Sequence, residues 1–211
     1  MWKPGTGIPR SSVNVNGLVG IQRFAMQQKL TLMVNRYEIR SVGPDGRPGE
    51  VLAVAQQKRM AFKESVTFYA DEDRRVPVCS FRARQRMDLG ATYDVFDADG
   101  TAIGNFRKDF AKSLLRSTWH LESGGITAVG TERNAAVALA RRAWEFVPIA
   151  ESLPSPFLFH FDFTDANGDV VLSSQRGRSL RDRYDVTVPG ARLDGRVAAA
   201  MAVALDALQS R

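Results

Sequence analysis

The stretch Asp194–Arg211, DGRVAAAMAVALDALQSR, contains nine consecutive apolar residues, from Val197 to Leu205. Alanine and methionine dominate this run, and both residues favour the α-helix. At 3.6 residues per turn, nine apolar residues cover every side of a helix, so other parts of the protein must enclose it. The run is too short to cross a bilayer, which takes about 20 residues. We therefore predict a hydrophobic C-terminal helix in the core of the fold.

Most of the remaining sequence has the pattern of short β-strands. From Phe24 onward, apolar and polar residues tend to alternate, as in strands with one buried face. Four residue pairs are typical of hairpin turns: Asp45-Gly46, Glu72-Asp73, Asp99-Gly100 and Asn167-Gly168. The predicted strands are Leu30–Arg40, Val51–Gln57, Ser65–Ala70, Val76–Arg86, Thr92–Ala98, Ala102–Lys108, Ser117–Glu122, Ile126–Gly130, Phe157–Thr164, Val170–Ser174 and Tyr184–Val188. About eleven strands are enough to close into a barrel around the helix.

One segment departs from the strand pattern. Thr131–Phe146, TERNAAVALARRAWEF, has a helical composition, and Thr131 is a residue type that caps helices. Apolar residues at helical spacing within it predict that one face packs on the barrel. The prolines at 148, 154 and 156 then predict a stiff connector. We therefore expect one peripheral helix in addition to the central one.

The size and composition of the chain favour one domain. The chain has 211 residues, of which 44% are hydrophobic and 25% are charged, as in ordinary globular proteins. We expect residues 1–17, rich in Gly, Pro, Ser and Asn, to form a flexible arm, and residues 18–211 to form a single barrel domain. Residues 1–36 contain five basic residues and no acidic one. A basic arm could contact an anionic surface, and a plain leader is the alternative.

The net charge and the cysteine count indicate the class of partner and the cellular compartment that we expect. A net charge of +6 favours an anionic partner such as a lipid surface, an acidic protein or nucleic acid. Cys79 is the only cysteine, so no internal disulfide is possible and a reducing compartment is expected. The N-terminal sequence lacks the apolar segment of a secretory signal. We expect a cytoplasmic protein, with peripheral attachment to a membrane as a further possibility.

Two segments resemble known families. Phe24–Tyr37, FAMQQKLTLMVNRY, resembles the opening of the LURP-one-related and phospholipid-scramblase-like families. Tyr93–Phe106, YDVFDADGTAIGNF, resembles their recurrent Y-x-V-x-D-x-x-G-x-x-I-G stretch, and Trp119 follows in the expected place. The resemblance spans residues 24–208 and implies the tubby C-terminal-like fold. In that fold a closed barrel of about twelve strands surrounds a central C-terminal helix.

The resemblance implies lipid binding more readily than any reaction. Tubby-like relatives bind phosphoinositides, and scramblase-like relatives have calcium-linked lipid roles. The sequence has no multi-cysteine cluster, no long proline-rich N-terminal region and no transmembrane-length segment, which scramblases use. Lipid transport across a bilayer is therefore not expected of this chain.

Alternating arginines on one predicted strand are the best candidates for a binding site. Arg82, Arg84 and Arg86 would project to one side of the strand about 6.6 Å apart, on the outside of a barrel. Neighbouring strand ends extend this patch with Lys58, Arg59, Arg107, Lys108 and Lys112. We predict that these residues bind anionic phospholipid. The alternative is that their charges only keep the outer face soluble.

Two acidic loops invite a calcium interpretation, which their spacing does not support. An EF-hand loop needs a glutamate at its twelfth position. Counting from Asp97 gives Lys108, and counting from Asp165 gives Arg176. Both loops are therefore predicted to be hairpin tips, and no metal site is expected.

No catalytic constellation is evident elsewhere. His120 and His160 are far apart, and the alternation in FLFHFDF places His160 with Asp162 on the outer face. Cys79 shares a strand face with Phe81, which predicts a buried and inert thiol. The basic run Arg176–Arg183 is interpreted as a solvated loop whose arginines pair with nearby carboxylates. No cofactor and no catalytic residue are predicted.

The leading hypothesis is a non-enzymatic cytosolic β-barrel module that binds anionic phospholipid at a membrane surface through a basic outer face. The alternative is a structural or protein-binding scaffold with no small-molecule ligand. Nucleic acid is disfavoured as a partner, because no helix concentrates base-reading side chains and the basic residues lack interleaved exposed aromatics.

Overall fold

The computed structural model of the chain describes residues 16–30, 34–58, 65–84, 92–109, 117–133, 160–177 and 183–209. In this part of the chain, twelve strands form one closed antiparallel barrel, and β1 completes it by pairing with β12. The strands are β1 (Arg23–Leu30), β2 (Val34–Val42), β3 (Pro48–Lys58), β4 (Ser65–Tyr69), β5 (Pro77–Ala83), β6 (Thr92–Asp97), β7 (Ala102–Lys108), β8 (Thr118–Ser123), β9 (Ile126–Glu132), β10 (His160–Asp165), β11 (Val170–Arg176) and β12 (Arg183–Thr187). A short 3₁₀ turn, η3 (Pro189–Ala191), leads into the helix α2 (Gly195–Gln209).

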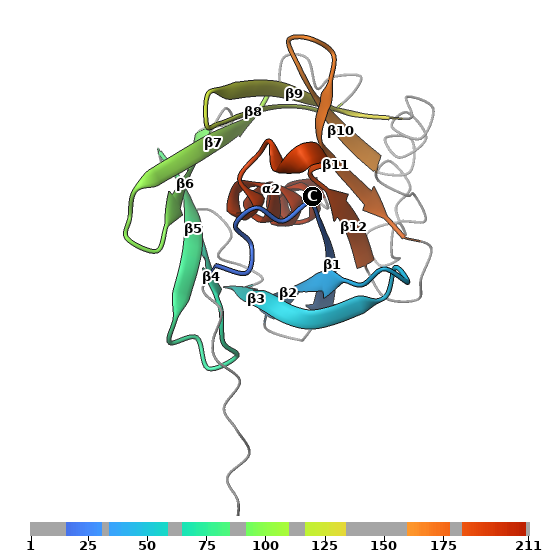
Figure 1. Cartoon of the computed structure of the whole chain (residues 1–211). Coiled ribbons are helices and arrows are strands. Elements are labelled where there is room, and N and C mark those ends of the chain that lie inside the picture. Colours follow the sequence, from blue (N-terminus) through green and yellow to red (C-terminus); the bar gives the residue numbers. More distant parts are fainter. Residues whose placement is uncertain are drawn as a thin grey trace, which may run out of the picture.

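The helix α2 lies inside the ring of strands (Figure 1). Every side chain from Val197 to Leu205 is at most 5% exposed, so the helix is enclosed on all sides, as its apolar run predicts. The carboxylate of Asp194 accepts a hydrogen bond from the backbone N–H of Arg196 at 2.8 Å and caps the first turn. The predicted mainly β fold, a closed barrel around a hydrophobic C-terminal helix, is confirmed. No helix in the described ranges is long and apolar enough to cross a membrane.

Large side chains from the inner face of the barrel fill the space around α2. The five bulkiest aromatic examples on strands β5 to β10 are each at most 1% exposed: Phe81, Phe106, Trp119, Phe161 and Phe163. Burial of one such side chain contributes about 1.5–3 kcal/mol to folding. The small alanine side chains of α2 leave room for these rings, because alanine adds little to the width of a helix. Gly130 faces Phe163 so closely that a Cβ atom at this position would lie 2.3 Å from the ring.

One polar residue of α2 is anchored to the barrel wall. Asp206 accepts hydrogen bonds from the hydroxyl groups of Tyr37 at 3.0 Å and Tyr184 at 2.5 Å. Burial, and then the charge and the hydrogen bond of Asp206, raise the pKa of Tyr37 well above its usual value. These two tyrosines stand on β2 and β12, the two strands that flank β1. The contact therefore fixes the rotation of the helix relative to the strands where the barrel closes.

The four predicted hairpin tips are all turns in the structure. Gly46, Gly100 and Gly168 have positive φ angles of 74°, 84° and 85°, which glycine adopts without strain. In two of these turns an aspartate organises the loop. Asp97 accepts hydrogen bonds from the backbone N–H groups of residues 99 and 101, and Asp165 does the same for residues 167 and 169. The acidic residues that suggested calcium loops therefore bond their own backbones.

The predicted strand boundaries are wrong at the beginning of the barrel. The sequence pattern predicts that a strand begins at Leu30, but Leu30 is the last residue of β1, and β2 starts at Val34. The sequence between these strands, Thr31-Leu32-Met33, contains none of the Gly, Asn, Asp or Pro residues that mark a turn. Without that signal, β1 could not be separated from β2.

The predicted start of the peripheral helix is also wrong. Thr131 and Glu132 belong to β9, where Thr131 pairs with Thr118 of β8 and Asp162 of β10. Pairing on both sides outweighs the preference of threonine for a helix cap. The rest of the predicted helix and the proline connector lie outside the described residues, as do residues 1–15 of the predicted arm.

Removal of α2 should abolish folding. We predict that a chain truncated after Pro189 is insoluble or unfolded, because the buried side chains of α2 together contribute as much as the net stability of a whole domain, about 5–15 kcal/mol. Two-dimensional NMR spectra should show collapsed amide dispersion for the truncated chain. A chain that lacks only residues 210–211 is the control and should keep the native spectrum. A well-dispersed spectrum from the longer truncation would contradict the enclosed-helix core.

Candidate anion-binding surface

The predicted basic strand presents its arginines on the outer face of the barrel. In β5, Cys79 and Phe81 face inward and are each 1% exposed, whereas Arg82 is exposed. Arg84 follows the strand, and its backbone N–H still bonds the carbonyl group of Thr92. Arg82 and Arg84 therefore occupy the outer face, as their alternation predicts.

Arg84 is already neutralised by a neighbouring strand. Its Nε and Nη2 atoms donate hydrogen bonds of 2.7–3.0 Å to both carboxylate oxygens of Asp94 on β6. These bonds raise the pKa of Arg84 above its usual value. Such a bidentate ion pair satisfies much of the hydrogen-bonding capacity of the guanidinium group. Arg84 is thus less suited to hold an external anion than its sequence position suggests.

Arg82 and Arg107 remain accessible on this side of the barrel. The guanidinium group of Arg82 lies 4.3 Å from the ring centre of Phe96, a stacking contact that orients it and leaves its N–H donors open. Arg107 is exposed on β7, between Thr92 of β6 and His120 of β8. In the described part of the chain, neither arginine has a carboxylate partner. We call this pair the Arg82/Arg107 face.

The structure places the other members of the predicted patch elsewhere or does not describe them. Lys108 is on the opposite face of β7 from Arg107, and its Nζ atom lies 5.9 Å from the ring of the buried Trp119. Lys108 therefore lies apart from the Arg82/Arg107 face, and its part in lipid binding stays a prediction. Arg59, Arg86 and Lys112 lie outside the described residues, and Lys58 is the last residue of β3, with no described side chain.

Other polar residues that the sequence singled out form local pairs. The Nε2 atom of His120 lies 3.1 Å from Asp109, and Arg183 donates a 2.8 Å hydrogen bond to Asp185, as predicted for the basic run. Asp162 bonds Arg133 at 2.6 and 2.7 Å, and the pKa of the carboxyl group falls, mainly because of that bond. The pairs His120–Asp109 and Asp162–Arg133 link neighbouring strands near their ends, and the pair Arg183–Asp185 lies within β12.

The single thiol is poorly placed for chemistry. Cys79 is buried against the helix, and burial raises its pKa to about 12. Its thiol is therefore protonated at neutral pH, and only the thiolate is a good nucleophile. The predicted burial of this cysteine is confirmed.

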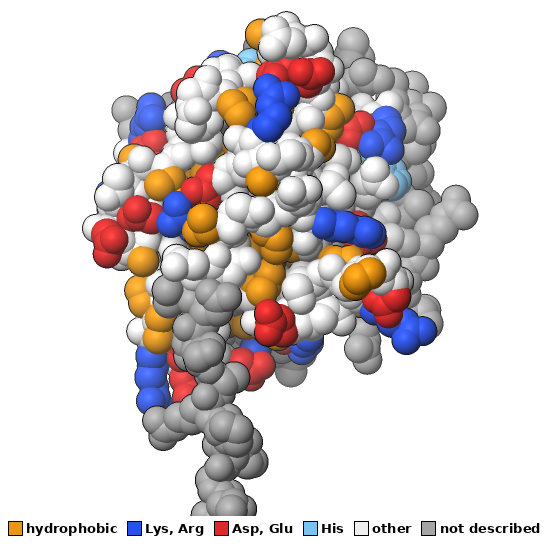
Figure 2. All heavy atoms as spheres, in the orientation of Figure 1, with side chains coloured by type: hydrophobic (Ala, Val, Ile, Leu, Met, Phe, Trp, Pro, Cys, Tyr) orange, Lys and Arg blue, Asp and Glu red, His pale blue; other side chains and the backbone are white. Residues whose placement is uncertain are grey.

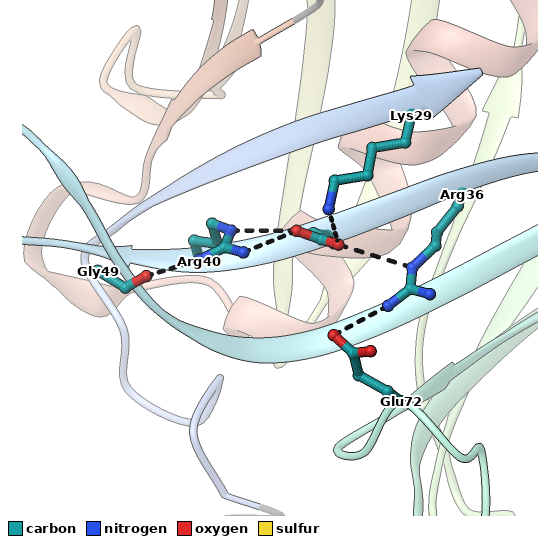
Figure 3. Close-up of polar contacts among 6 residues, drawn as sticks. Lys29, Arg36, Arg40, Gly49 and Glu72 are labelled. Carbon is teal, nitrogen blue, oxygen red and sulfur yellow. Dashed lines mark hydrogen bonds and ion pairs between the residues drawn. The ribbon is translucent and has the colours of Figure 1, made fainter. Parts of the chain in front are cut away.

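A second basic group, which the sequence did not predict as a site, lies on the outer face of β1 and β2 (Figure 3). Its centre is the carboxylate of Glu38, whose side chain is only 1% exposed. Lys29 Nζ lies 2.5 Å from Oε1, and Arg36 Nε lies 3.6 Å from the same oxygen. Arg40 donates from Nη2 and Nε to Oε2 at 2.9 and 3.2 Å. We call these four residues the Glu38 cluster.

The register of the strands assembles this cluster. In β2, Tyr37 and Ile39 face inward, so Glu38 faces outward together with Arg36 and Arg40, two residues away on each side. Gln27 of β1 pairs with Glu38, and Lys29 follows Gln27 by two residues on the same face. Three basic side chains converge on the carboxylate, and the aliphatic stems of such side chains can cover the surface beneath them, which accounts for its burial on an outer face.

The charges of the cluster do not cancel. Burial alone would raise the pKa of Glu38, but hydrogen bonds from Lys29 and Arg40 and their charges outweigh it and lower the pKa. Glu38 is therefore ionised at neutral pH and offsets one of three positive charges. Arg36 also contacts Glu72 at 3.2 Å, but that carboxylate is 69% exposed and belongs to a hairpin turn (Figure 3). The surface around Glu38 keeps a local positive excess.

On the face shown in Figure 2, basic and acidic side chains are interspersed, and no continuous basic field is present. Any anion-binding site on this face is therefore a local one. The sequence did contain a signal for the Glu38 cluster, namely the alternation of Arg36, Glu38 and Arg40 along one strand face. The contribution of Lys29 depends on the pairing of β1 with β2, which the sequence does not reveal.

Comparison with known proteins gave one family match. A family model described as LURP-one-related matches residues 51–206, which is more than half of the chain. The matched range begins within β3 and ends within α2, so it contains most of the barrel and the Arg82/Arg107 face. The Glu38 cluster precedes it. No curated protein and no solved structure gave a match.

Glu38 should contribute to stability in a pH-dependent way. We predict that Glu38→Gln lowers the free energy of unfolding by about 1–3 kcal/mol at neutral pH, because charged hydrogen bonds are lost. The folded-state pKa of Glu38 is lowered, so its contribution is complete above the unfolded pKa of about 4.3 and is lost as the pH falls through the folded value. The free energies of unfolding of wild type and variant, measured by denaturant titration, should therefore become equal in acid.

The control for this experiment is Glu72→Gln, which removes an exposed carboxylate beside the same arginine. We expect it to change stability by less than about 0.5 kcal/mol. Equal stability of the Glu38 variant and wild type at neutral pH would show that the carboxylate is not a structural counter-ion.

Proposed function

This chain belongs to the LURP-one-related family, and we propose that it is a non-enzymatic module that binds anionic phospholipid at a membrane surface through the basic outer face of its barrel. The observation that carries this proposal is the filled interior. The side chains of α2 and the inward aromatic residues occupy the centre of the barrel. A ligand is therefore expected on the outside of the strands.

The charge of the protein supports an anionic ligand. The chain has a net charge of +6, and Arg82 and Arg107 present guanidinium groups without a carboxylate partner among the described residues. A basic residue near an anionic membrane contributes about 1 kcal/mol. Two to five such residues would contribute about 2–5 kcal/mol, which corresponds to dissociation constants from about 30 mM down to about 0.2 mM. The proposed attachment is therefore weak, reversible and sensitive to salt.

The chemistry of the described residues supports a binding role over a catalytic one. A nucleophilic mechanism needs a reactive group beside a base. The thiol of Cys79 is buried and protonated, and His120 contacts the carboxylate of Asp109 on the outer face.

A protein-binding scaffold is the second candidate, and the paired charges of the outer face favour it. Arg84 and Arg133, which directly follow β5 and β9, form ion pairs with Asp94 and Asp162 of the neighbouring strands. A surface of mixed charge fits a protein partner as well as a lipid. The membrane proposal is preferred because the net charge and the Arg82/Arg107 face are both positive.

Sedimentation with lipid vesicles tests the proposal. We predict that the protein sediments at low salt with phosphatidylcholine vesicles that contain phosphatidylserine, and not with phosphatidylcholine alone. The double variant Arg82→Glu/Arg107→Glu should lower the partition coefficient at least about tenfold, because it reverses two charges at the surface.

A matched control reverses two charges elsewhere. Arg47 and Arg75 are 87% and 79% exposed on hairpin turns, so Arg47→Glu/Arg75→Glu changes the net charge equally. This control should partition more strongly than the Arg82/Arg107 variant. Equal partitioning of the two variants would reject a specific lipid-binding face, and no sedimentation of wild type would favour the scaffold.

A further inference from the structure

We propose that Lys29 and Arg36, held by Glu38 on the outer face of β1 and β2, form a binding site for a phosphate monoester group. The site differs from the Arg82/Arg107 face in position and in ligand. The Arg82/Arg107 face is proposed to attract an anionic surface through diffuse charge. The Glu38 cluster is organised to hold one compact anion, whether or not the protein binds membranes.

The first argument is the arrangement of the donor atoms. Lys29 Nζ and Arg36 Nε contact the same oxygen of Glu38, at 2.5 and 3.6 Å (Figure 3). Two nitrogen atoms around one oxygen are close enough for a single tetrahedral anion to bridge their side chains. Lysine has three donors and arginine has five, so Glu38 uses only part of their capacity. The ammonium group of Lys29 is also accessible, since its side chain is 53% exposed.

The second argument is that Arg40 and Glu38 already act as a scaffold. Arg40 directs two donors to Glu38 Oε2 and a third, Nη1, to the carbonyl oxygen of Gly49 at 3.0 Å. The guanidinium group of Arg40 is thus held by Glu38 and by Gly49, and few of its N–H donors remain for a ligand. Glu38 in turn holds Lys29 and Arg36 side by side before any ligand arrives. Such preorganisation reduces the ordering cost that weak binding sites usually carry.

The third argument is an unsatisfied donor. Within the described ranges, the Nε atom of Arg36 is buried and has no hydrogen-bond partner, because Glu38 is too distant at 3.6 Å. A buried donor without an acceptor costs free energy, so a small shift of Arg36 toward an incoming oxygen would be favourable. The Nη2 atom of Arg36 contacts the exposed carboxylate of Glu72, at 3.2 Å. An anion can displace that carboxylate, because an exposed ion pair contributes little free energy to stability.

The charge balance selects a phosphate monoester. Three basic side chains and one buried carboxylate leave two positive charges when Glu72 is displaced. A phosphate monoester carries about 1.5–2 negative charges at pH 7 and three acceptor oxygens. A carboxylate or a phosphodiester brings only one charge and would leave the excess uncompensated. Arginine and lysine are also the side chains that most often bind phosphate.

Titration with inorganic phosphate tests the site directly. We expect saturable shifts in the ¹H–¹⁵N spectrum of the full chain at constant ionic strength, centred on the amides of β1 and β2 and on the Arg36 side chain. Lys29→Gln and Arg36→Gln should each weaken binding about tenfold or more, because each removes charged hydrogen bonds. Arg107→Gln removes one positive charge from the other face and should bind phosphate like wild type.

Glu72→Gln is the decisive variant, because it should strengthen binding. Glu72 competes with the ligand for Arg36, so its removal is expected to raise the affinity about two- to fivefold. The substitution is in an exposed turn and leaves the donors in place, so a folding defect cannot imitate this result. Shifts that do not saturate, shifts centred away from β1 and β2, or an unchanged affinity of the Glu72 variant would overturn the proposal.

Vesicles distinguish a lipid headgroup from a free phosphate as the natural source. Phosphatidic acid presents a monoester, whereas phosphatidylserine presents a diester. If the headgroup is the source, Glu72→Gln should increase sedimentation with phosphatidic acid vesicles and not with phosphatidylserine vesicles. Loss of phosphatidylserine binding in the Arg82/Arg107 variant, with phosphate affinity intact, would support two separate sites. Loss of phosphate affinity in that variant would overturn the assignment to the Glu38 cluster.

Discussion

The whole structure depends on the enclosure of α2. A helix with apolar side chains on every side is unstable in water, and a twelve-stranded barrel without a central element would leave its inner face unpacked. Each therefore supplies the surface that the other lacks. Because α2 is rich in alanine, the strands contribute the large aromatic side chains, and the polar contact of Asp206 with Tyr37 and Tyr184 sets the rotation of the helix. With the interior filled, the outer face is left to interact with other molecules.

The sequence was sufficient to predict the architecture but not all of its boundaries. The nine-residue apolar run predicts enclosure, and the Asx–Gly turns predict hairpins, because both signals are local. The boundary between β1 and β2 was not predicted, since Thr31-Leu32-Met33 contains no turn residue. Local composition predicts a helix at Thr131, whereas pairing with Thr118 of β8 and Asp162 of β10 places this residue in a strand. Eleven of the strands were anticipated from the pattern, and the twelfth only through the family resemblance.

The candidate sites were less predictable because ion pairs form across strands. Alternation placed Arg82 and Arg84 on one face correctly, but it could not show that Asp94 of the neighbouring strand binds Arg84. In the same way, no local rule brings Lys29 beside Glu38, which depends on the pairing of β1 with β2. The net charge therefore overestimates the number of basic residues that are available to a ligand. The strand register decides which charged side chains form ion pairs within the protein and which stay available to a ligand.

Closure of the barrel through β1 and β12 also restricts when the protein can fold during its synthesis. The ribosome releases β1 long before β12 and α2, and β1 has one unpaired edge until β12 is made. During that interval the inward aromatic side chains have no helix to pack against, and open strand edges favour association with other chains. Contacts between such distant segments also slow folding. We therefore expect nascent chains to need protection from aggregation until the last helix has emerged.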